Sequence, residues 1–289
     1  MVDWVNAVVQ GILLGGLYAL FAAGLSLIFG VMRLVNIAHG DLIVLAAFLG
    51  LTVTTTLGIN PLASLAIVVP LMGVLGYLVQ RLILNRTISD DILPALLVTF
   101  GLSVIIQNAL LEIYTADPRK MNAGAIETAS VSLPAGLNIG VLPLIMFVTA
   151  VAVIAGLERV FFHSSWGRAF RATSDNPRIV GLMGLDRNHV HALAMALSLM
   201  VVGLAGVFLG IRASFDPALG PGRLIFGFEA VIIGGLGNLW GTLAGGIILG
   251  VSQNIGAQIN PGWQILAGHL AFLVVLAVRP RGIFPRIEG

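Results

Sequence analysis

AVIIGGLGNLWGTLAGGIILGVSQNIGAQINPGWQILAGHLAFLVVLAV, residues 230–278, runs for 49 positions without an Asp, Glu, Lys or Arg. A helix needs about 20 apolar residues to cross a bilayer. This stretch is therefore too long for one membrane span and long enough for two, joined at Asn260-Pro261-Gly262. Leu42–Gln80 repeats the pattern with 39 uncharged residues, interrupted at 58–61. Helices that are apolar all round need a core or a membrane to bury them, so the sequence predicts an all-α integral membrane protein.

The composition agrees with this prediction and excludes several kinds of chemistry. Hydrophobic residues make up 58% of the chain and charged residues 10%, against about 25% charged residues in globular domains. The chain has no cysteine, which excludes disulfides, thiol catalysis and cysteine metal sites. The uncharged run Trp4–Met32 is too long for the apolar core of a signal peptide and no basic segment precedes it, so we expect no cleavable signal.

The few charges predict the orientation of the spans. Arginine supplies 14 of the 15 cations, clustered at 81–86, 159–187 and 279–286. Positive charge concentrates on the cytoplasmic side, so we place these clusters inside, the mixed-charge segment 116–140 outside, the amino terminus outside and the carboxy terminus inside. The chain is then a single transmembrane domain, residues 1–289, with eight or nine transmembrane helices. The spans are expected near 5–31, 41–57, 62–82, 92–112, 141–159, 190–211, 241–259 and 263–279.

A further apolar segment, 224–236, is too short to be an ordinary span. Thirteen helical residues cover about 20 Å of the roughly 30 Å core. Orientation nevertheless requires an odd number of crossings between 212–223 and the carboxy terminus. We therefore expect a short or broken helix that ends at the turn Gly234-Gly235-Leu236-Gly237. Non-helical backbone within a membrane indicates a transport path; the alternative is a glycine-rich packing seam.

The longest polar interruption is residues 162–187, FHSSWGRAFRATSDNPRIVGLMGLDR. Its apolar and cationic edges favour two short helices on the membrane surface, although a solvated loop has the same composition. Gly167, Arg168, Arg171, Asn176, Pro177 and Gly184 occur here in an order that resembles the cytoplasmic coupling segment of permeases of branched-chain amino acid ABC importers.

Three other stretches resemble the same family in the same order. They are Asn36-Ile37-Ala38-His39-Gly40-Asp41 after the first span, Gly234-Gly235-Leu236-Gly237 with Gly241, and Arg279-Pro280-Arg281-Gly282-Ile283-Phe284 at the end of the chain. The resemblance implies a permease that moves branched-chain or other apolar amino acids by alternating access. Urea and short-chain amide importers share these motifs, so their cargo is the alternative.

The resemblance also implies the partners. They are a second related permease, two cytoplasmic ATPase subunits, an extracytoplasmic substrate-binding protein and the lipid of the cell (inner) membrane; no nucleic acid is expected. The chain has no G-x-x-x-x-G-K-S/T phosphate loop. We therefore expect no enzyme and no bound cofactor, with ATP hydrolysed by the partner subunits.

Glu229 is the only acidic residue between Asp216 and Glu288. An ionisable group at membrane depth usually faces a cavity or a charged partner. Three interpretations remain open. Glu229 lies at the outer mouth, paired with Arg223 or Arg212. Alternatively it lines the translocation path with Gly234, Gly235 and Gly237 and meets the ammonium or amide of the substrate, or it is paired structurally elsewhere.

Asn36, His39 and Asp41 place an amide, an imidazole and a carboxylate where the first span ends. Two potential ligands without a third do not predict a metal site. Ser26, His39 and Asp41 could form a hydrolase triad, but no oxyanion motif accompanies them. We expect a hydrogen-bonded break between helices that shapes the translocation path.

The segments expected outside present Asp117, Arg119, Lys120, Asp216 and Arg223. A mixed-charge surface suits transient docking of a soluble binding protein, and ordinary solvated loops are the alternative. A self-sufficient channel or secondary transporter is a more distant possibility, since it would not need the coupling segment.

Overall fold

The computed structural model describes residues 2–88, 91–133, 137–175, 181 and 184–284. The long helices are α1 (Val2–Met32), α2 (His39–Leu57), α3 (Pro61–Leu82), α4 (Leu93–Tyr114), α6 (Val141–His163), α9 (Arg187–Arg212), α10 (Gly220–Gly234), α11 (Leu239–Ile259) and α12 (Gln264–Val278). The short elements are η1 (Leu84–Arg86), α5 (Ala125–Thr128), α7 (Ser165–Asp175), η3 (Pro217–Leu219), η4 (Pro261–Trp263) and the antiparallel strands β1 (Ser130–Leu133) and β2 (Leu137–Gly140).

Eight helical segments in the described part of the chain are long and apolar enough to cross a membrane. α11 is not one of them, although it has 21 residues, because Ser252, Gln253 and Asn254 lower its hydropathy. The prediction of an all-α membrane protein with eight or nine spans is confirmed. The short helix expected at 224–236 is α10, which begins four residues earlier and has 15 residues.

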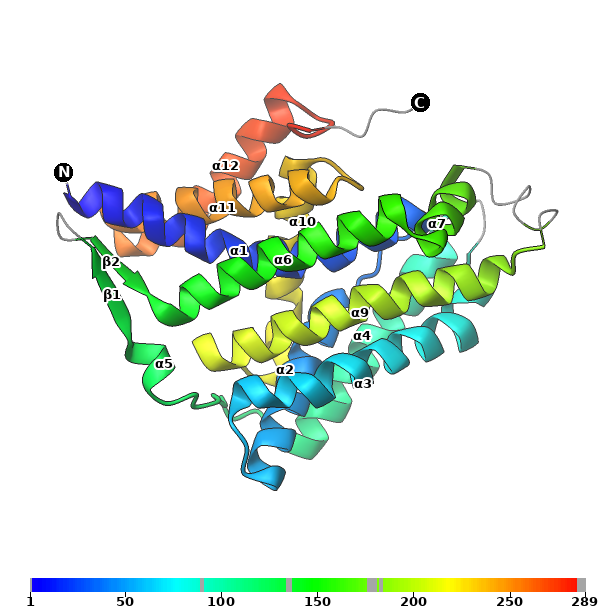
Figure 1. Cartoon of the computed structure of the whole chain (residues 1–289), viewed down its shortest axis with the longest axis horizontal. Helices are drawn as coiled ribbons and strands as arrows, with labels where there is room; N and C mark the ends of the chain where they lie inside the picture. Colours follow the sequence, from blue (N-terminus) through cyan, green and yellow to red (C-terminus); the bar gives the residue numbers. More distant parts are fainter. Residues whose placement is uncertain (1, 89–90, 134–136, 176–180, 182–183, 285–289) are drawn as a thin grey trace.

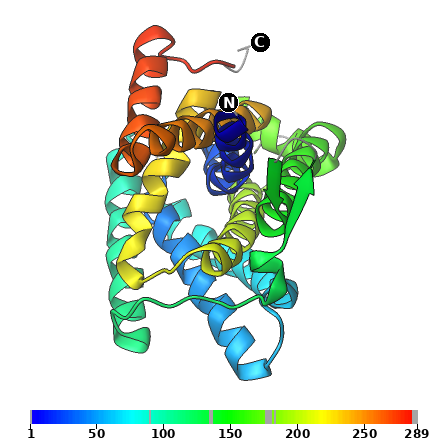
Figure 2. The same cartoon turned by 90° about the vertical axis from the view of Figure 1, so that its left-hand side faces the viewer.

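Helix α1 is the centre of the bundle. It contacts α6, α9, α10 and α11, and Figure 2 shows it between α11 and α6. Small residues let helix backbones approach closely in membranes, and glycines form the seam between α1 and α11. A Cβ added to Gly250 would lie 2.3 Å from the Gly11 carbonyl oxygen, and one added to Gly15 would lie 2.5 Å from the Ile247 Cα.

Three helices begin at side-chain caps that the sequence supplies. Asn60, Asp186 and Asn238 each accept a hydrogen bond from a backbone N–H in the first turn of α3, α9 and α11. Such caps satisfy N–H groups that have no partner within the helix. α12 lies at the edge of the bundle (Figure 1), and Gly268 is its one buried residue.

The two ends of the bundle are distinct. Figure 1 shows the amino terminus beside β1 and β2, and α7 at the opposite end of the long helices. Gln10 fixes this arrangement because its Nε2 donates a hydrogen bond to the Asn138 carbonyl oxygen over 2.7 Å. The amino terminus and the hairpin, both expected outside, therefore lie together.

This arrangement predicts opposite accessibility for the two termini. Cysteine can be introduced singly into the cysteine-free chain as Asp3→Cys and Arg281→Cys. In intact cells, a membrane-impermeant thiol reagent should label Asp3→Cys and leave Arg281→Cys unlabelled until the membrane is opened. Asn122→Cys in the outer segment and Arg168→Cys in α7 are the matched controls. Labelling of Asp3→Cys and Arg281→Cys from one side would mean that α10 re-enters without crossing.

Candidate translocation path and coupling surface

Helix α7 is an amphipathic surface helix that the sequence fixes to the end of α6. Gly167 lies so close to α6 that an added Cβ would be 2.1 Å from the Phe161 carbonyl oxygen. The Gly167 N–H donates to Ser164 Oγ over 3.0 Å. Arg171 donates to the same Phe161 carbonyl, and its guanidinium lies 5.3 Å from the centre of the Phe162 ring. A cation at the carboxyl end of a helix is electrostatically favourable.

The two arginines of α7 therefore have different environments. Arg171 is half-buried and holds α6, whereas Arg168 is exposed. Trp166 is also exposed, at 51%, and sequence reasoning missed it. Ser174 donates to the Gly30 carbonyl oxygen over 2.8 Å, which links α7 to the end of α1.

The expected second helix of the 162–187 segment lies mostly outside the described residues, as do Asn176 and Pro177. Gly184 has a φ of +77°, a left-handed conformation that glycine adopts readily at the end of a helix. Its N–H donates to the Gly181 carbonyl oxygen over 3.2 Å.

The Asn36–Asp41 segment returns along α1 to its middle. Arg33 has a φ of +52°, where the chain leaves α1. His39 Nε2 lies 2.9 Å from the Phe21 carbonyl oxygen, so Nε2 carries the proton and Nδ1 is left as a buried atom without a partner. Asn36 Oδ1 accepts from the Ala38 N–H over 3.0 Å. The expected hydrogen-bonded break is thus present in the middle of the bundle.

Asp41 faces α4 and not His39. Ser103 Oγ donates to its Oδ2 over 2.5 Å, and Gln107 Nε2 donates to its Oδ1 over 3.0 Å. Hydrogen bonds of this kind offset the cost of a buried carboxylate. Among the described residues, no three His, Asp or Glu side chains gather as metal ligands. His39 bonds to the Phe21 carbonyl oxygen and not to the Ser26 hydroxyl, whose Oγ has no partner, so these residues do not form a triad.

Glu229 is 4% exposed, and it pairs with a residue that sequence reasoning missed. Its Oε1 contacts His269 Nδ1 of α12, while its Oε2 has no hydrogen-bond partner. The expected pairing with Arg223 or Arg212 is absent from the described ion pairs. The sequence does single out His269 as a partner for Glu229, because it is the only ionisable residue in the apolar run 230–278.

The glycine turn and the carboxy-terminal motif form one site. Gly235 and Gly237 have φ values of +107° and +78°. Gly234 packs on Gly241: a Cβ added to Gly234 would lie 2.1 Å from the Gly241 carbonyl oxygen. The tail then pairs with this turn, since Phe284 N–H donates to the Gly234 carbonyl oxygen over 3.1 Å. Gly234 and Gly235 are buried, so the backbone of this turn packs closely against its neighbours.

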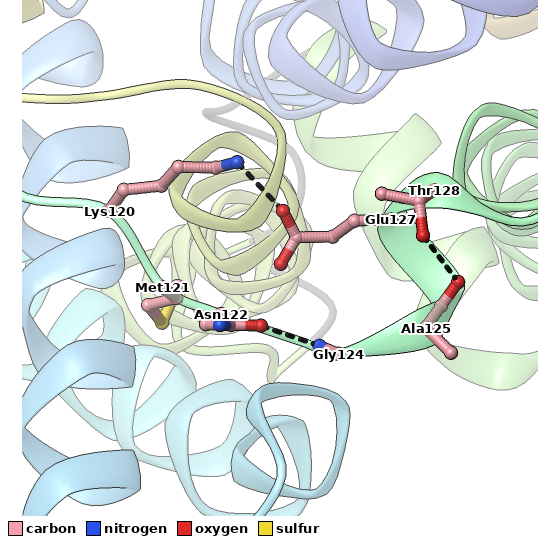
Figure 3. Close-up of a pocket in the computed structure, with 7 residues that line it drawn as sticks. All are labelled: Lys120, Met121, Asn122, Gly124, Ala125, Glu127 and Thr128. Carbon is pink, nitrogen blue, oxygen red and sulfur yellow. Dashed lines mark hydrogen bonds and ion pairs between the residues drawn. The ribbon is translucent and has the colours of Figure 1, made fainter.

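The segment that is expected outside is ordered by one acidic side chain. Glu127 accepts from Lys120 Nζ over 2.7 Å and from the Ala123 N–H over 2.6 Å, as Figure 3 shows for the lysine. The bond from Lys120 and then the backbone bond hold the pKa of the Glu127 carboxyl below its usual value. A pocket of about 420 Å³ lies beside this pair. Arg223, expected in the outer loops, instead lies within α10, and its Nε is buried.

Long apolar helices, a broken helix pair in the middle of the bundle and a surface helix at one end define a polytopic membrane permease. The family model described as branched-chain amino acid transport system / permease component matches residues 7–278. The chain belongs to this family.

Individual relatives extend over nearly the whole chain. The high-affinity branched-chain amino acid transport system permease protein BraD of Pseudomonas aeruginosa is 26% identical and aligns over 99% of this chain and 97% of its own length. LivH of Salmonella typhimurium, a permease protein of the same description, is 27% identical over 96% of this chain and 94% of its own length. LivM of Escherichia coli K12 is 26% identical over 49% of this chain and 33% of its own length.

A solved structure shares the fold. The complex of PsaBC from Streptococcus pneumoniae with Fab contains a chain that matches with a TM-score of 0.51 and 14% identity, over 94% of this chain and 91% of that chain. At this identity the likeness concerns the fold alone.

Proposed function

We propose that this chain is a permease subunit of an ATP-binding-cassette importer that carries branched-chain amino acids across the cell (inner) membrane by alternating access. The family match over 7–278 carries this proposal. The relatives BraD and LivH, which align over nearly their full lengths, are named for branched-chain amino acid transport.

The importer works as an assembly. A second related permease completes the translocation path, and the partial match to LivM, a differently named permease, supports such a partner. Two cytoplasmic ATPase subunits hydrolyse ATP, and an extracytoplasmic binding protein delivers the substrate. This chain binds no cofactor of its own.

The surface helix α7 couples the ATPases to the path. Arg168 and Trp166 are exposed and contact the ATPase, while Gly167 and Arg171 fix α7 to α6. A displacement of α7 therefore moves α6 and, through Ser174, the end of α1. Asn176, Pro177 and Gly184 belong to the same coupling segment.

The translocation path runs past the breaks in the helices. Asn36, His39 and Asp41 form one break and Glu229 lies in α10, with Gly234, Gly235 and Gly237 at its end. Buried polar atoms without a partner occur at Asn36 Nδ2, His39 Nδ1 and Glu229 Oε2, and such atoms are expected where water or substrate passes.

Reconstitution tests this function. Proteoliposomes that contain this chain, its partner permease and the ATPases should accumulate labelled leucine only with ATP inside and binding protein outside. A hundredfold excess of unlabelled isoleucine or valine should suppress the signal, and the same excess of urea or acetamide should not. Uptake without ATP would contradict the proposal of an ATP-driven importer. Competition by urea or acetamide would show that the importer carries urea or short-chain amides.

A further inference from the structure

Several polar side chains surround the ring of Phe226 in α10. The Tyr18 and His269 rings lie 5.2 Å and 6.1 Å from it, centre to centre. The guanidinium of Arg223 lies 5.8 Å from the centre of the same ring. Tyr18 also donates from its hydroxyl to Gln253 Oε1 over 2.5 Å. Helices α1, α10 and α12 thus meet at one aromatic side chain, and Gln253 of α11 is joined to it through Tyr18. We call these residues, with Arg212 and Glu229, the Phe226 cluster.

Three buried polar atoms in this cluster have no hydrogen-bond partner. They are Arg223 Nε, Glu229 Oε2 and Gln253 Nε2. Glu229 is 4% exposed and Gln253 is 1% exposed. A buried polar atom left unpaired is destabilising, and most such atoms in folded proteins have partners. Two donors and one acceptor of the same cluster, all without partners, indicate a ligand that offers both acceptors and donors.

The cluster has a cationic end. Arg212 is the last residue of α9, and it lies close enough to Arg223 for the two positive charges to repel each other. Asp216 acts on Arg223 electrostatically, but neither arginine forms an ion pair among the described residues. Two guanidinium groups with no described carboxylate at ion-pair distance are suited to a bound carboxylate, which arginine binds through two parallel hydrogen bonds.

The other end of the cluster is anionic. Glu229 is its carboxylate, and His269 occupies only one of the two oxygens. Arg223 and Glu229 are six residues apart on α10, which is about 9 Å along the helix. The Arg223 guanidinium lies over the ring of Phe226, the residue midway between the two in the sequence of α10. The His269 side chain is 38% exposed, so the cluster reaches the surface of this chain at α12.

We propose that the Phe226 cluster is a transit site for the zwitterionic head group of an α-amino acid, with Arg223 and Arg212 at its carboxylate and Glu229 at its ammonium. The aliphatic side chain lies against Phe226. The inference rests on the proposed function. It adds that the permease itself binds both charged groups of the substrate after the binding protein has released it. A neutral amide offers neither charge.

The test uses the complete importer in proteoliposomes, with leucine uptake and ATPase activity measured together. Arg223→Gln and Glu229→Gln should each lower uptake about tenfold or more, as expected when a charged contact to substrate is removed. ATPase activity stimulated by loaded binding protein should stay within about twofold of the unmodified value. Arg159→Gln and Glu112→Gln, which neutralise exposed residues of α6 and α4, should change neither value.

Charge-conserving variants separate recognition from folding. Arg223→Lys and Glu229→Asp should retain most of the uptake that the glutamine variants lose. If all four variants lose uptake and assembly equally, the cluster is structural and the inference is wrong. If the glutamine variants transport leucine normally, it is wrong as well. Failure of the unmodified importer to take up leucine would instead contradict the proposed function.

A binding measurement examines the two charges separately. Phe226→Cys and His269→Cys introduce single reporters, of which the second lies at the exposed edge. Leucine should slow their reaction with a small thiol reagent. Leucine amide keeps only the ammonium and 4-methylvalerate keeps only the carboxylate, so each should protect far less at the same concentration. Equal protection by all three compounds, or none by leucine at either reporter, would overturn the assignment.

Discussion

Arg168→Glu should abolish coupled transport while leaving the permease folded. Arg168 is exposed on α7, and the Gly167, Ser164 and Arg171 contacts that hold α7 to α6 do not involve its side chain. Reversal of a charge at a protein interface typically costs several kcal/mol. We therefore expect a loss of about tenfold or more in both ATP-dependent leucine uptake and stimulated ATPase activity.

Two further variants separate a loss of ATPase binding from a loss of coupling. Arg86→Glu reverses another exposed charge, in η1, and should have little effect. Arg171→Ala removes the bond to α6, so the ATPases should still bind while transport per ATP falls. Co-purification of the ATPases measures binding, and the ratio of uptake to hydrolysis measures coupling. Full uptake by Arg168→Glu would exclude α7 as the contact with the ATPase.

Gly250→Leu should prevent stable folding of the permease. Gly250 faces α1, where an added Cβ would lie 2.3 Å from the Gly11 carbonyl oxygen and 2.7 Å from the Gly15 nitrogen. Both are backbone atoms, so a side chain fits only if α1 and α11 separate. Overpacking usually costs about 1–3 kcal/mol and occasionally more, and a clash with backbone belongs at the upper end. The expected result is little monodisperse protein after heating in detergent.

The same substitution elsewhere supplies the control. Gly101 in α4 and Gly156 in α6 have open space where a Cβ would stand. Gly101→Leu and Gly156→Leu should therefore survive heating like the unmodified protein, with Gly250→Ala between these extremes. Similar melting of all the leucine variants would show that the α1–α11 seam does not limit stability.

The pairing of motifs in space could not be derived from the sequence. The glycine turn at 234–237 and the tail at 282–284 are widely separated along the chain, yet Gly282 packs against Gly235, where an added Cβ would lie 2.6 Å from the Gly235 nitrogen. Both motifs were recognisable, but no local pattern connects them. Their glycines are explained once the two backbones are seen in contact.

The sequence by itself determined the membrane class, the approximate limits of the spans and the position of the surface helix. These follow from one-dimensional quantities: the length of uncharged runs against the thickness of hydrocarbon, the placement of arginine, and an amphipathic segment between two apolar ones. The short helix near 224–236 followed from the same lengths, because a segment of that size cannot be an ordinary span.

Only the tertiary structure decided which polar groups meet. It paired Glu229 with His269 instead of an arginine, turned Arg223 inward and used Arg171 to hold α6. The physical reason is that spanning helices are apolar on nearly every face, so their sequences carry little periodic signal for which face packs against which neighbour. Close packing of glycine backbones chooses those faces, and the chosen faces decide which buried charges become partners.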